Sequence, residues 1–205
     1  MMVEDIFGID SGRHRAIADI FASNGYNVFM SELLQPYYDG PMDMPAIVGC
    51  IKGQDYEKME INFSKVLGHI KSTVGVEKMP CIGFCWGVWY SFKMSAKYDC
   101  FTAIAGPHPS LGAEGIFGGT ATAVAEKVKC PAYFLPAGND ADDVKEKGEV
   151  VELLTKKFGA ELTGTVHFPD MVHGWTTRGD LKDEKVSRDF HKALHLIQEY
   201  LAKLK

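Results

Sequence analysis

The chain has 205 residues, of which 46% are hydrophobic and 24% are charged, and its formal net charge is −5 at pH 7. This length supports one substantial core and is short for two, so we expect a single domain over residues 1–205. The acidic balance excludes the basic surface that nucleic acid binding requires, and no apolar run reaches the roughly 18 residues that span a bilayer. The N-terminus lacks a signal-peptide pattern, so we expect a cytoplasmic protein without a membrane or nucleic-acid partner.

Short β-rich runs alternate along the chain with segments of helical period, which is typical of an α/β domain with a parallel sheet. The predicted strands are 26–33, 80–84, 101–106, 130–138 and 162–169. The predicted helices are 12–24, 56–73, 86–97, 144–158 and 181–203. The first few residues look like the end of a further strand, which indicates that part of the fold is missing upstream.

The cysteines argue against a metal site or a disulfide framework. They form an odd set without a C-x-x-C pair, which disfavours zinc-ribbon and thioredoxin-type sites. We expect reduced thiols, no metal and no cofactor, with most of the cysteines acting as small buried apolar residues. The five are Cys50, Cys81, Cys85, Cys100 and Cys130.

Cys85 is the exception, because CIGFCWGVWY (81–90) places it between Gly83 and Gly87 where a predicted strand meets a predicted helix. A sharp strand-to-helix turn projects the side chain at its apex and requires small residues two before and two after it. The helix start favours the thiolate of Cys85, and the backbone N–H of Trp86 can donate to a developing oxyanion. The pattern therefore predicts a nucleophilic cysteine.

A nucleophile of this kind requires a base. His173, in PDMVHGW, follows the last predicted strand directly, and a base at the strand tips is expected there. His108, in GPHPS, also follows a strand end and is the competing candidate. The remaining histidines lie within predicted helices or a strand and are better explained as structural or solvated.

The carboxylate that would orient the base is expected in LPAGNDADDV. This segment offers Asp140, Asp142 and Asp143, and each of them could instead cap a helix in contact with solvent. Asp140 is nearest to the strand tip. The resulting chain order of cysteine, aspartate and histidine is that of α/β-hydrolase triads.

Several segments, in order over nearly the whole chain, resemble the dienelactone hydrolase family of α/β-hydrolases, in which a cysteine replaces the usual serine. They are EDIFGID (4–10), ASNGYNVFMSELL (22–34), GFCWG (83–87), HPS (108–110), LPAGND (135–140) and VHGW (172–175). The HPS and HGW signatures are most similar to the eukaryotic-type branch. The resemblance implies a three-layer sandwich with a mostly parallel sheet flanked by helices, and the first strands of the family are expected to be missing.

The resemblance also implies the roles of particular residues. It implies a triad of Cys85, Asp140 and His173, with the backbone N–H groups of Trp86 and Ile6 stabilising the oxyanion. The motif LPAGND matches without a gap at Asp140, which favours it over the neighbouring acids.

Residues around the triad are also candidates for the site, one from the resemblance and the others from their positions in the sequence. Where family members have a glutamate that interacts with the resting thiol, this chain has Asp5, which is one methylene shorter. His108 and Trp175 are expected to line the substrate pocket. Arg178, five residues after His173, is expected to pair with a substrate carboxylate.

The function implied is hydrolysis of a small ester or lactone by thiolate attack, acyl-enzyme formation and release by water, in a monomer or homodimer. Three alternatives stay open. Glutamine amidotransferases share the G-x-C-x-G turn but carry a glutamate two residues after the base, where this chain has Trp175. Cys85 could instead be a redox-sensing thiol. The fold could also be a catalytically weak hydrolase that binds carbonyl ligands.

Overall fold

The computed structural model describes residues 1–204 and contains a six-stranded sheet in the order β2-β1-β3-β4-β5-β6. All neighbouring strands run parallel. The strands are β1 (Met2–Val3), β2 (Met30–Ser31), β3 (Met79–Gly83), β4 (Phe101–Pro107), β5 (Ala132–Leu135) and β6 (Gly164–Thr165). The predicted parallel α/β sheet is confirmed.

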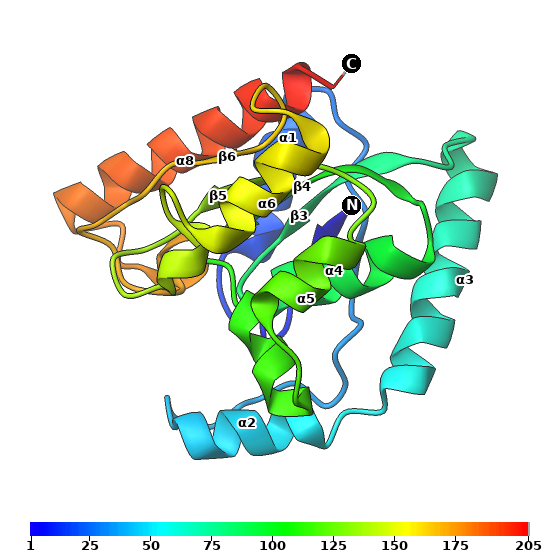
Figure 1. The fold of residues 1–205 in the computed structure, drawn as a ribbon, viewed down its shortest axis with the longest axis horizontal. Helices are drawn as coiled ribbons and strands as arrows, with labels where there is room; N and C mark the ends of the chain where they lie inside the picture. The colour runs from blue at the N-terminus through cyan, green and yellow to red at the C-terminus, as the bar shows by residue number, and fades with distance from the viewer. Residues whose placement is uncertain (205) are drawn as a thin grey trace.

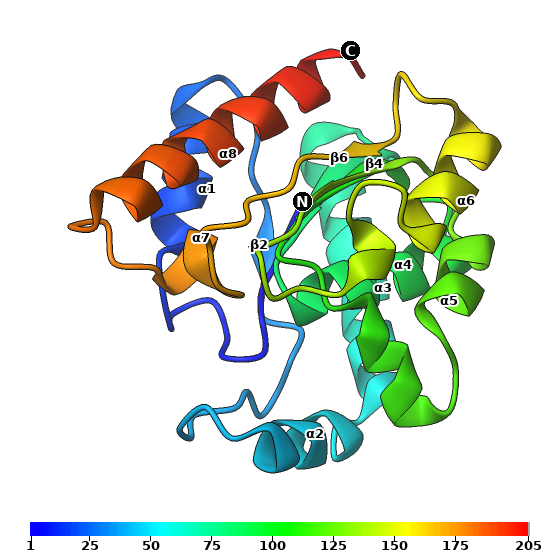
Figure 2. The same cartoon turned by 60° about the vertical axis from the view of Figure 1, so that its left-hand side comes forward.

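Helices cover both faces of this sheet, which gives three layers (Figure 1). The α-helices are α1 (His14–Ser23), α2 (Met44–Lys52), α3 (Tyr56–Val74), α4 (Trp86–Lys97), α5 (Ala121–Lys127), α6 (Glu149–Phe158), α7 (Trp175–Arg178) and α8 (Glu184–Ala202). Figure 2 shows α1, α7 and α8 on one side of the sheet and α3, α4, α5 and α6 on the other. Two 3₁₀ helices, η1 (Leu111–Phe117) and η2 (Asp142–Val144), lie in connections.

The two outer layers are held by separate hydrophobic clusters, one on each face of the sheet. On one face, α8 buries Phe190, Leu194, Ile197 and Leu201 at helical spacing, which is the pattern that predicted this helix. On the other face, α4 is buried along almost its whole length. The turn at the start of α4 is therefore held on a helix with little freedom to move.

The sequence analysis placed the long helices well and several other elements poorly. The segment 26–33, predicted as a strand, pairs only over Met30–Ser31, because it forms the edge of the sheet with a neighbour on one side. The 3₁₀ helix η1 and helix α5 lie in a stretch for which no helix was predicted. Helix α5 is only seven residues long and depends on Thr120, whose hydroxyl accepts from Ala123 N–H at 3.1 Å. So short a helix has too few residues to show a helical period.

The parallel topology brings five connections to one edge of the sheet, because the carboxyl ends of parallel strands meet there. The segments that follow β1, β3, β4, β5 and β6 carry Ile6, Cys85, Ser110, Asp140 and His173, respectively. A candidate site built from widely separated segments is therefore a consequence of strand direction.

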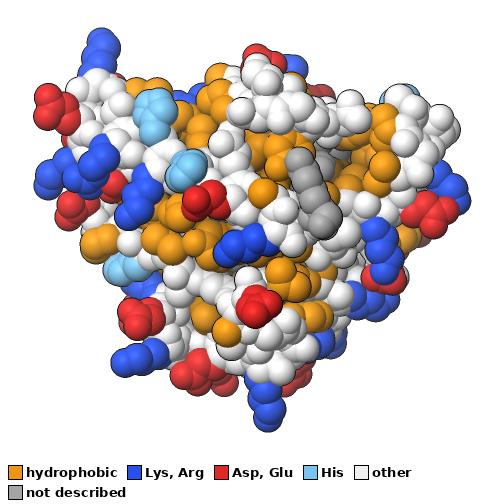
Figure 3. Space-filling view, turned by 90° about the horizontal axis from the view of Figure 1, so that it is seen from above, with side chains coloured by type: hydrophobic (Ala, Val, Ile, Leu, Met, Phe, Trp, Pro, Cys, Tyr) orange, Lys and Arg blue, Asp and Glu red, His pale blue; other side chains and the backbone are white. Residues whose placement is uncertain are grey.

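The face of the molecule seen from above in Figure 3 has charged side chains of both signs, with hydrophobic side chains grouped nearer its centre. Neither sign of charge forms a continuous stripe on this face. Among residues 1–204, no helix combines the length and the apolar character needed to cross a bilayer.

Candidate active site

Cys85 occupies a strained turn between β3 and α4, as predicted. Its backbone has φ 53° and ψ −118°, a conformation that L-residues rarely adopt and that is found mainly at functional sites. A Cβ at Gly83 would lie 2.8 Å from the backbone of Gly87, and one at Gly87 would overlap the carbonyl oxygens of Val3 and Glu4. Both flanking glycines are thus required for strand and helix to approach each other this closely.

His173 and Asp140 meet directly. Nδ1 of His173 lies 2.5 Å from Oδ1 of Asp140, and the other carboxylate oxygen of Asp140 accepts the backbone N–H of Ala137 at 2.6 Å. The backbone N–H of His173 donates to Oδ1 of Asn139 at 2.7 Å. The loop after β5 therefore fixes both the imidazole ring and the backbone of the loop after β6.

Asp142 does not take part in this contact. Its side chain is 96% exposed and pairs with Lys145 at 2.9 Å. Asp143 lies in the same short 3₁₀ helix and likewise makes no contact with His173. Of the three acids that the sequence left open, only Asp140 reaches the imidazole.

The thiol and the imidazole shift each other's pKa. Burial alone would raise the pKa of Cys85, but the positive charge of His173 and hydrogen bonds from His173 and Ser110 outweigh it and lower that pKa below its usual value. Burial likewise opposes the imidazolium, yet the charges of Cys85 and Asp140 raise the pKa of His173 to about 10. Each group therefore stabilises the charged form of the other, the thiolate of Cys85 and the imidazolium of His173.

Two backbone N–H groups near the turn have no acceptor. Within residues 1–204, the N–H of Trp86 and the N–H of Ile6 make no hydrogen bond. Ile6 lies in the turn after β1, which is closed by Gly8 N–H donating to the Asp5 carbonyl at 3.1 Å, and Trp86 follows β3, the neighbouring strand. Free donors on adjacent connections are what an oxyanion site requires.

The carboxylate of Asp5 lies in a buried polar cluster. Its carboxylate accepts from Arg178 Nη2 at 2.5 Å and from Thr177 Oγ1 at 3.1 Å, and His14 Nε2 lies 3.3 Å from it. Burial would raise the pKa of Asp5, but His14 and Arg178 lower it to about 2. Asp5 is a fixed anion without a hydrogen bond to Cys85, so the contact that family members make through a glutamate is not made here.

Arg178 is consequently not a free cation. Besides the ion pair with Asp5, its Nη1 donates to Ser11 Oγ at 2.9 Å, and its guanidinium lies 4.0 Å from the centre of the Phe7 ring. The sequence predicted that Arg178 would pair with a substrate carboxylate. The structure places it in an internal ion pair whose charge is already compensated.

His108 and Trp175, which were expected to line the pocket, are both buried. His108 is fully buried, with Nε2 2.5 Å from Thr176 Oγ1 and its ring centre 5.1 Å from that of His173. Burial and the positive charge of His173 lower the pKa of His108 well below its usual value, so it is neutral. Trp175 is 3% exposed and packs against Phe168 in the core beneath α8.

The sequence analysis missed three contributors to this region. Ser110 contacts both the thiol and the imidazole, Asn139 holds the backbone of His173, and His14 lies beside Asp5. Ser110 belongs to the HPS motif, where only the histidine was considered. His14 was interpreted as a structural helix residue because nothing local in the sequence relates it to Asp5.

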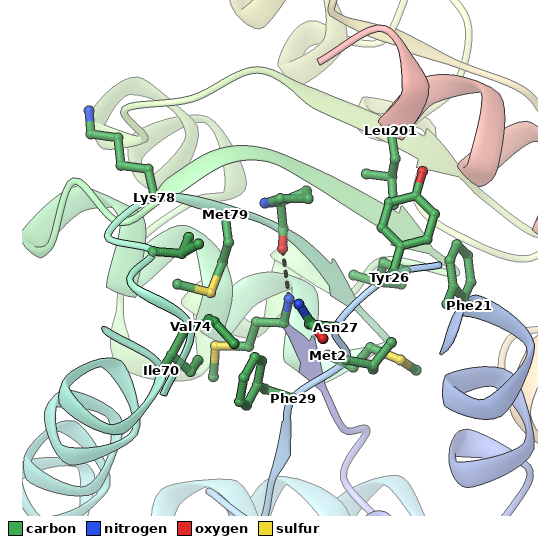
Figure 4. A pocket seen from close by; sticks show the side chains of 15 residues that line it. Met2, Phe21, Tyr26, Asn27, Phe29, Ile70, Val74, Lys78, Met79 and Leu201 are labelled. Carbon is green, nitrogen blue, oxygen red and sulfur yellow. Dashed lines mark hydrogen bonds between the residues drawn. The ribbon is translucent and has the colours of Figure 1, made fainter. Parts of the chain in front are cut away.

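An apolar cavity lies away from these residues. It has a volume of about 200 Å³ and is lined mainly by apolar side chains, among them Met2, Phe29 and Met79 (Figure 4). Met79 begins β3, whereas Cys85 follows the end of that strand, so this cavity is at the opposite edge of the sheet. A second cavity of about 400 Å³ lies between α3 and α4. Neither is lined by Cys85, Asp140 or His173.

A parallel sheet between two helical layers, with a cysteine at a strained strand-to-helix turn and an Asp–His pair at the same edge, defines the α/β-hydrolase class. The chain belongs to the dienelactone hydrolase family, whose sequence model matches residues 1–201. The family resemblance inferred from the motifs is confirmed.

Individual relatives agree with this assignment. The carboxymethylenebutenolidase homolog of Homo sapiens is 25% identical over 181 residues, which is 82% of this chain and 70% of the relative. The homolog of Xenopus tropicalis is 25% identical over 182 residues, or 87% of this chain and 70% of the relative.

Solved structures share the fold at low identity. A putative dienelactone hydrolase from Klebsiella pneumoniae superposes with a TM-score of 0.71 at 17% identity, covering 98% of this chain and 85% of that one. A dienelactone hydrolase-like promiscuous phosphotriesterase from metagenomic libraries gives a TM-score of 0.65 at 16% identity, covering 97% and 84%. Family and fold together support a hydrolase of the ester-cleaving type.

Proposed function

We propose that this chain hydrolyses small esters or lactones, with Cys85 as the nucleophile, His173 as the base and Asp140 as the group that orients the base. The observation that carries the proposal is the direct contact of Asp140 with His173, whose ring in turn lowers the pKa of a cysteine at a strained turn. Redox or structural thiols have no need of the carboxylate behind the imidazole.

The reaction begins from the thiolate of Cys85. Sγ attacks the carbonyl carbon, and the oxygen that becomes negative is bound by the free N–H groups of Trp86 and Ile6. His173, protonated on both ring nitrogens, gives its Nε2 proton to the departing alkoxide, and a thioester is left on Cys85. In a lactone the alkoxide stays attached to the acyl group.

The second half of the reaction regenerates the thiolate. His173, now neutral, takes a proton from a water molecule that attacks the thioester, and the same N–H groups bind the second oxyanion. Collapse expels Cys85 as the thiolate and releases the acid, while His173 regains its charge. Asp140 orients and stabilises the imidazolium through Nδ1 in both halves of the reaction.

The charge balance around the site favours a neutral substrate. Arg178 is paired with Asp5, His108 is neutral, and the charge of His173 is matched by Cys85 and Asp140. A substrate carboxylate would therefore meet no uncompensated cation among these groups and would lose its hydration without a new partner. We propose uncharged esters and lactones as the preferred class.

Replacing the nucleophile tests the proposal. Cys85→Ala should abolish turnover of an aryl ester, whereas Cys50→Ala should retain it, because Cys50 lies on α2 and burial raises the pKa of its thiol. A trapped acyl adduct on Cys85, detected by mass spectrometry with an activated ester, would show the intermediate directly. Parental hydrolysis by Cys85→Ala would refute the assignment.

A redox-sensing thiol is the second candidate, and the lowered pKa of Cys85 favours it, since a thiolate is what peroxide oxidises. Sulfenic acid on Cys85 after mild peroxide, together with no acyl adduct, would support this function over hydrolysis.

A further inference from the structure

Ser110 lies between the two reacting groups of the candidate site. Its hydroxyl oxygen is 3.4 Å from Sγ of Cys85 and 3.5 Å from Nε2 of His173. Ser110 comes from the segment after β4, a third connection that supplies neither the thiol nor the imidazole. The hydroxyl is the one side-chain group of the described residues that makes a hydrogen bond to both of these atoms.

The backbone holds Ser110 in this place. Its N–H donates to the carbonyl of Cys85 at 3.2 Å, and its own carbonyl accepts from Ala113 N–H at 3.0 Å. Although Ser110 immediately precedes η1, its side chain makes no capping hydrogen bond to that helix. The hydroxyl is thus free of the structural role that a serine before a helix ordinarily has.

A hydroxyl can donate one hydrogen bond while it accepts others, and it does so without carrying a charge. With the site in its thiolate and imidazolium form, the Ser110 hydroxyl donates to the sulfur and accepts from Nε2–H. Both charged partners are then satisfied by one neutral group. Hydrogen bonds of this kind to ions are about twice as strong as those between neutral groups.

We propose that Ser110 is a positioning residue that bridges the thiolate of Cys85 and the imidazolium of His173 and holds them in the geometry for attack. The inference rests on the proposed function, because it assigns Ser110 a part in preparing that nucleophile. Ser110 acts through Cys85 and His173 and forms no bond with the substrate.

The test measures the thiolate directly and needs no ester substrate. The rate of Cys85 alkylation by iodoacetamide, followed by mass spectrometry from pH 5 to pH 10, reports the pKa of the thiol. Ser110→Ala should move the alkylation midpoint upward by about one pH unit, so that alkylation on the acid limb slows about tenfold. Ser110→Thr keeps the hydroxyl and should keep the parental profile.

A matched control comes from a second serine beside a cysteine. Ser95 Oγ lies 3.5 Å from Sγ of Cys130, far from the site in sequence, and Ser95→Ala should leave Cys85 alkylation unchanged. If Ser110→Ala does not fold, the isosteric pair Ser110→Thr and Ser110→Val gives the same comparison, since only the threonine has a hydroxyl.

Hydrolysis measurements then separate this inference from the proposed function. Ser110→Ala should lower kcat about tenfold with KM within twofold, in parallel with the alkylation shift. An unchanged alkylation profile in Ser110→Ala or in Ser110→Val would overturn the role of Ser110, even with an active parental enzyme. If the parental protein hydrolyses no ester, the proposed function is wrong. The alkylation shift would still show whether Ser110 bridges Cys85 and His173.

Discussion

Asp140 lies 2.5 Å from Nδ1 of His173, although the two residues are 33 positions apart in the chain. They meet because β5 and β6 are adjacent and parallel, so that the loops after them leave the same edge of the sheet. The contact fixes the tautomer and orientation of the imidazole and leaves Nε2 facing Ser110 and the thiol. The chemistry proposed for Cys85 depends on this pair.

Substitutions at Asp140 and Asp142 give a matched test of the contact between Asp140 and His173. Asp140→Asn should lower kcat by about 10²–10⁴-fold, because the imidazolium loses the anion that stabilises and orients it. Asp142→Asn should leave kcat within twofold, since its side chain is exposed and paired with Lys145. Steady-state kinetics on one aryl ester, with circular dichroism to verify folding, decides the matter. Equal losses in both variants would contradict the assignment of Asp140.

The pH dependence of activity should reflect the two shifted groups. The pKa of Cys85 is lowered, so the acid limb of kcat/KM should lie below the ordinary thiol value of about 8.5. The pKa of His173 is raised to about 10, so the imidazolium that protonates the leaving group should persist through neutral pH and be lost near pH 10. An acid limb at pH 8.5 or above would show that the thiol is not activated.

The same two shifts predict how the free energy of unfolding changes with pH. From about pH 6.5 to 8.5 the unfolded pair, thiol and neutral imidazole, binds one proton, and native His173 keeps its own proton up to about pH 10, so the native pair binds at least as many protons and its contribution does not rise with pH. Above this range the unfolded thiol loses its proton while His173 keeps its own up to about pH 10, so the contribution declines as pH rises.

Urea denaturation at pH 5, 7 and 9 measures this contribution as the difference between the parental protein and the double variant Cys85→Ala/His173→Ala. The difference should be smaller at pH 9 than at pH 7, because the unfolded pair loses protons that native His173 keeps. A difference that rises steadily across the three values would show that the two groups are not an ion pair in the native state.

The turn at Cys85 should depend on its glycines. Gly83→Ala places a methyl group 2.8 Å from the backbone of Gly87 and should lower the free energy of unfolding by about 2 kcal/mol or more, as overpacking does. Gly68→Ala, on the exposed side of α3 with nothing within 4 Å, should instead raise it by roughly 0.5–1 kcal/mol. Denaturant titrations of both variants provide the comparison. If Gly83→Ala leaves the free energy of unfolding unchanged, β3 and α4 do not approach each other as closely as described.

The ion pair of Asp5 and Arg178 should matter far more than an exposed one. Asp5→Ala removes the partner of Arg178 and of His14 inside a buried cluster, which should cost about 3–5 kcal/mol of unfolding free energy. Asp10→Ala removes an exposed pair with Arg15 and should leave stability essentially unchanged. Thermal melts of the two variants test this difference. If Asp5→Ala and Asp10→Ala have comparable melting temperatures, the Arg178 ion pair is exposed to solvent. Arg178 would then again be a candidate to bind a substrate carboxylate.

The sequence alone was sufficient for the fold class and for the strand-to-helix turn at Cys85, because both depend on local patterns. Helical period identified α3, α4 and α8, and two glycines around Cys85 identified the turn, since close approach of strand and helix restricts those positions to glycine. The sequence also narrowed the base to two histidines and the acid to three aspartates.

Only the tertiary structure showed which of these histidines and aspartates lie next to each other, because this depends on which segments meet at the edge of the sheet. It joined Asp140 to His173, buried Trp175, and paired Arg178 with Asp5, a residue 173 positions away. It also brought Ser110 beside Cys85. Contacts between distant segments follow from strand order and register, and no local pattern of residues records them.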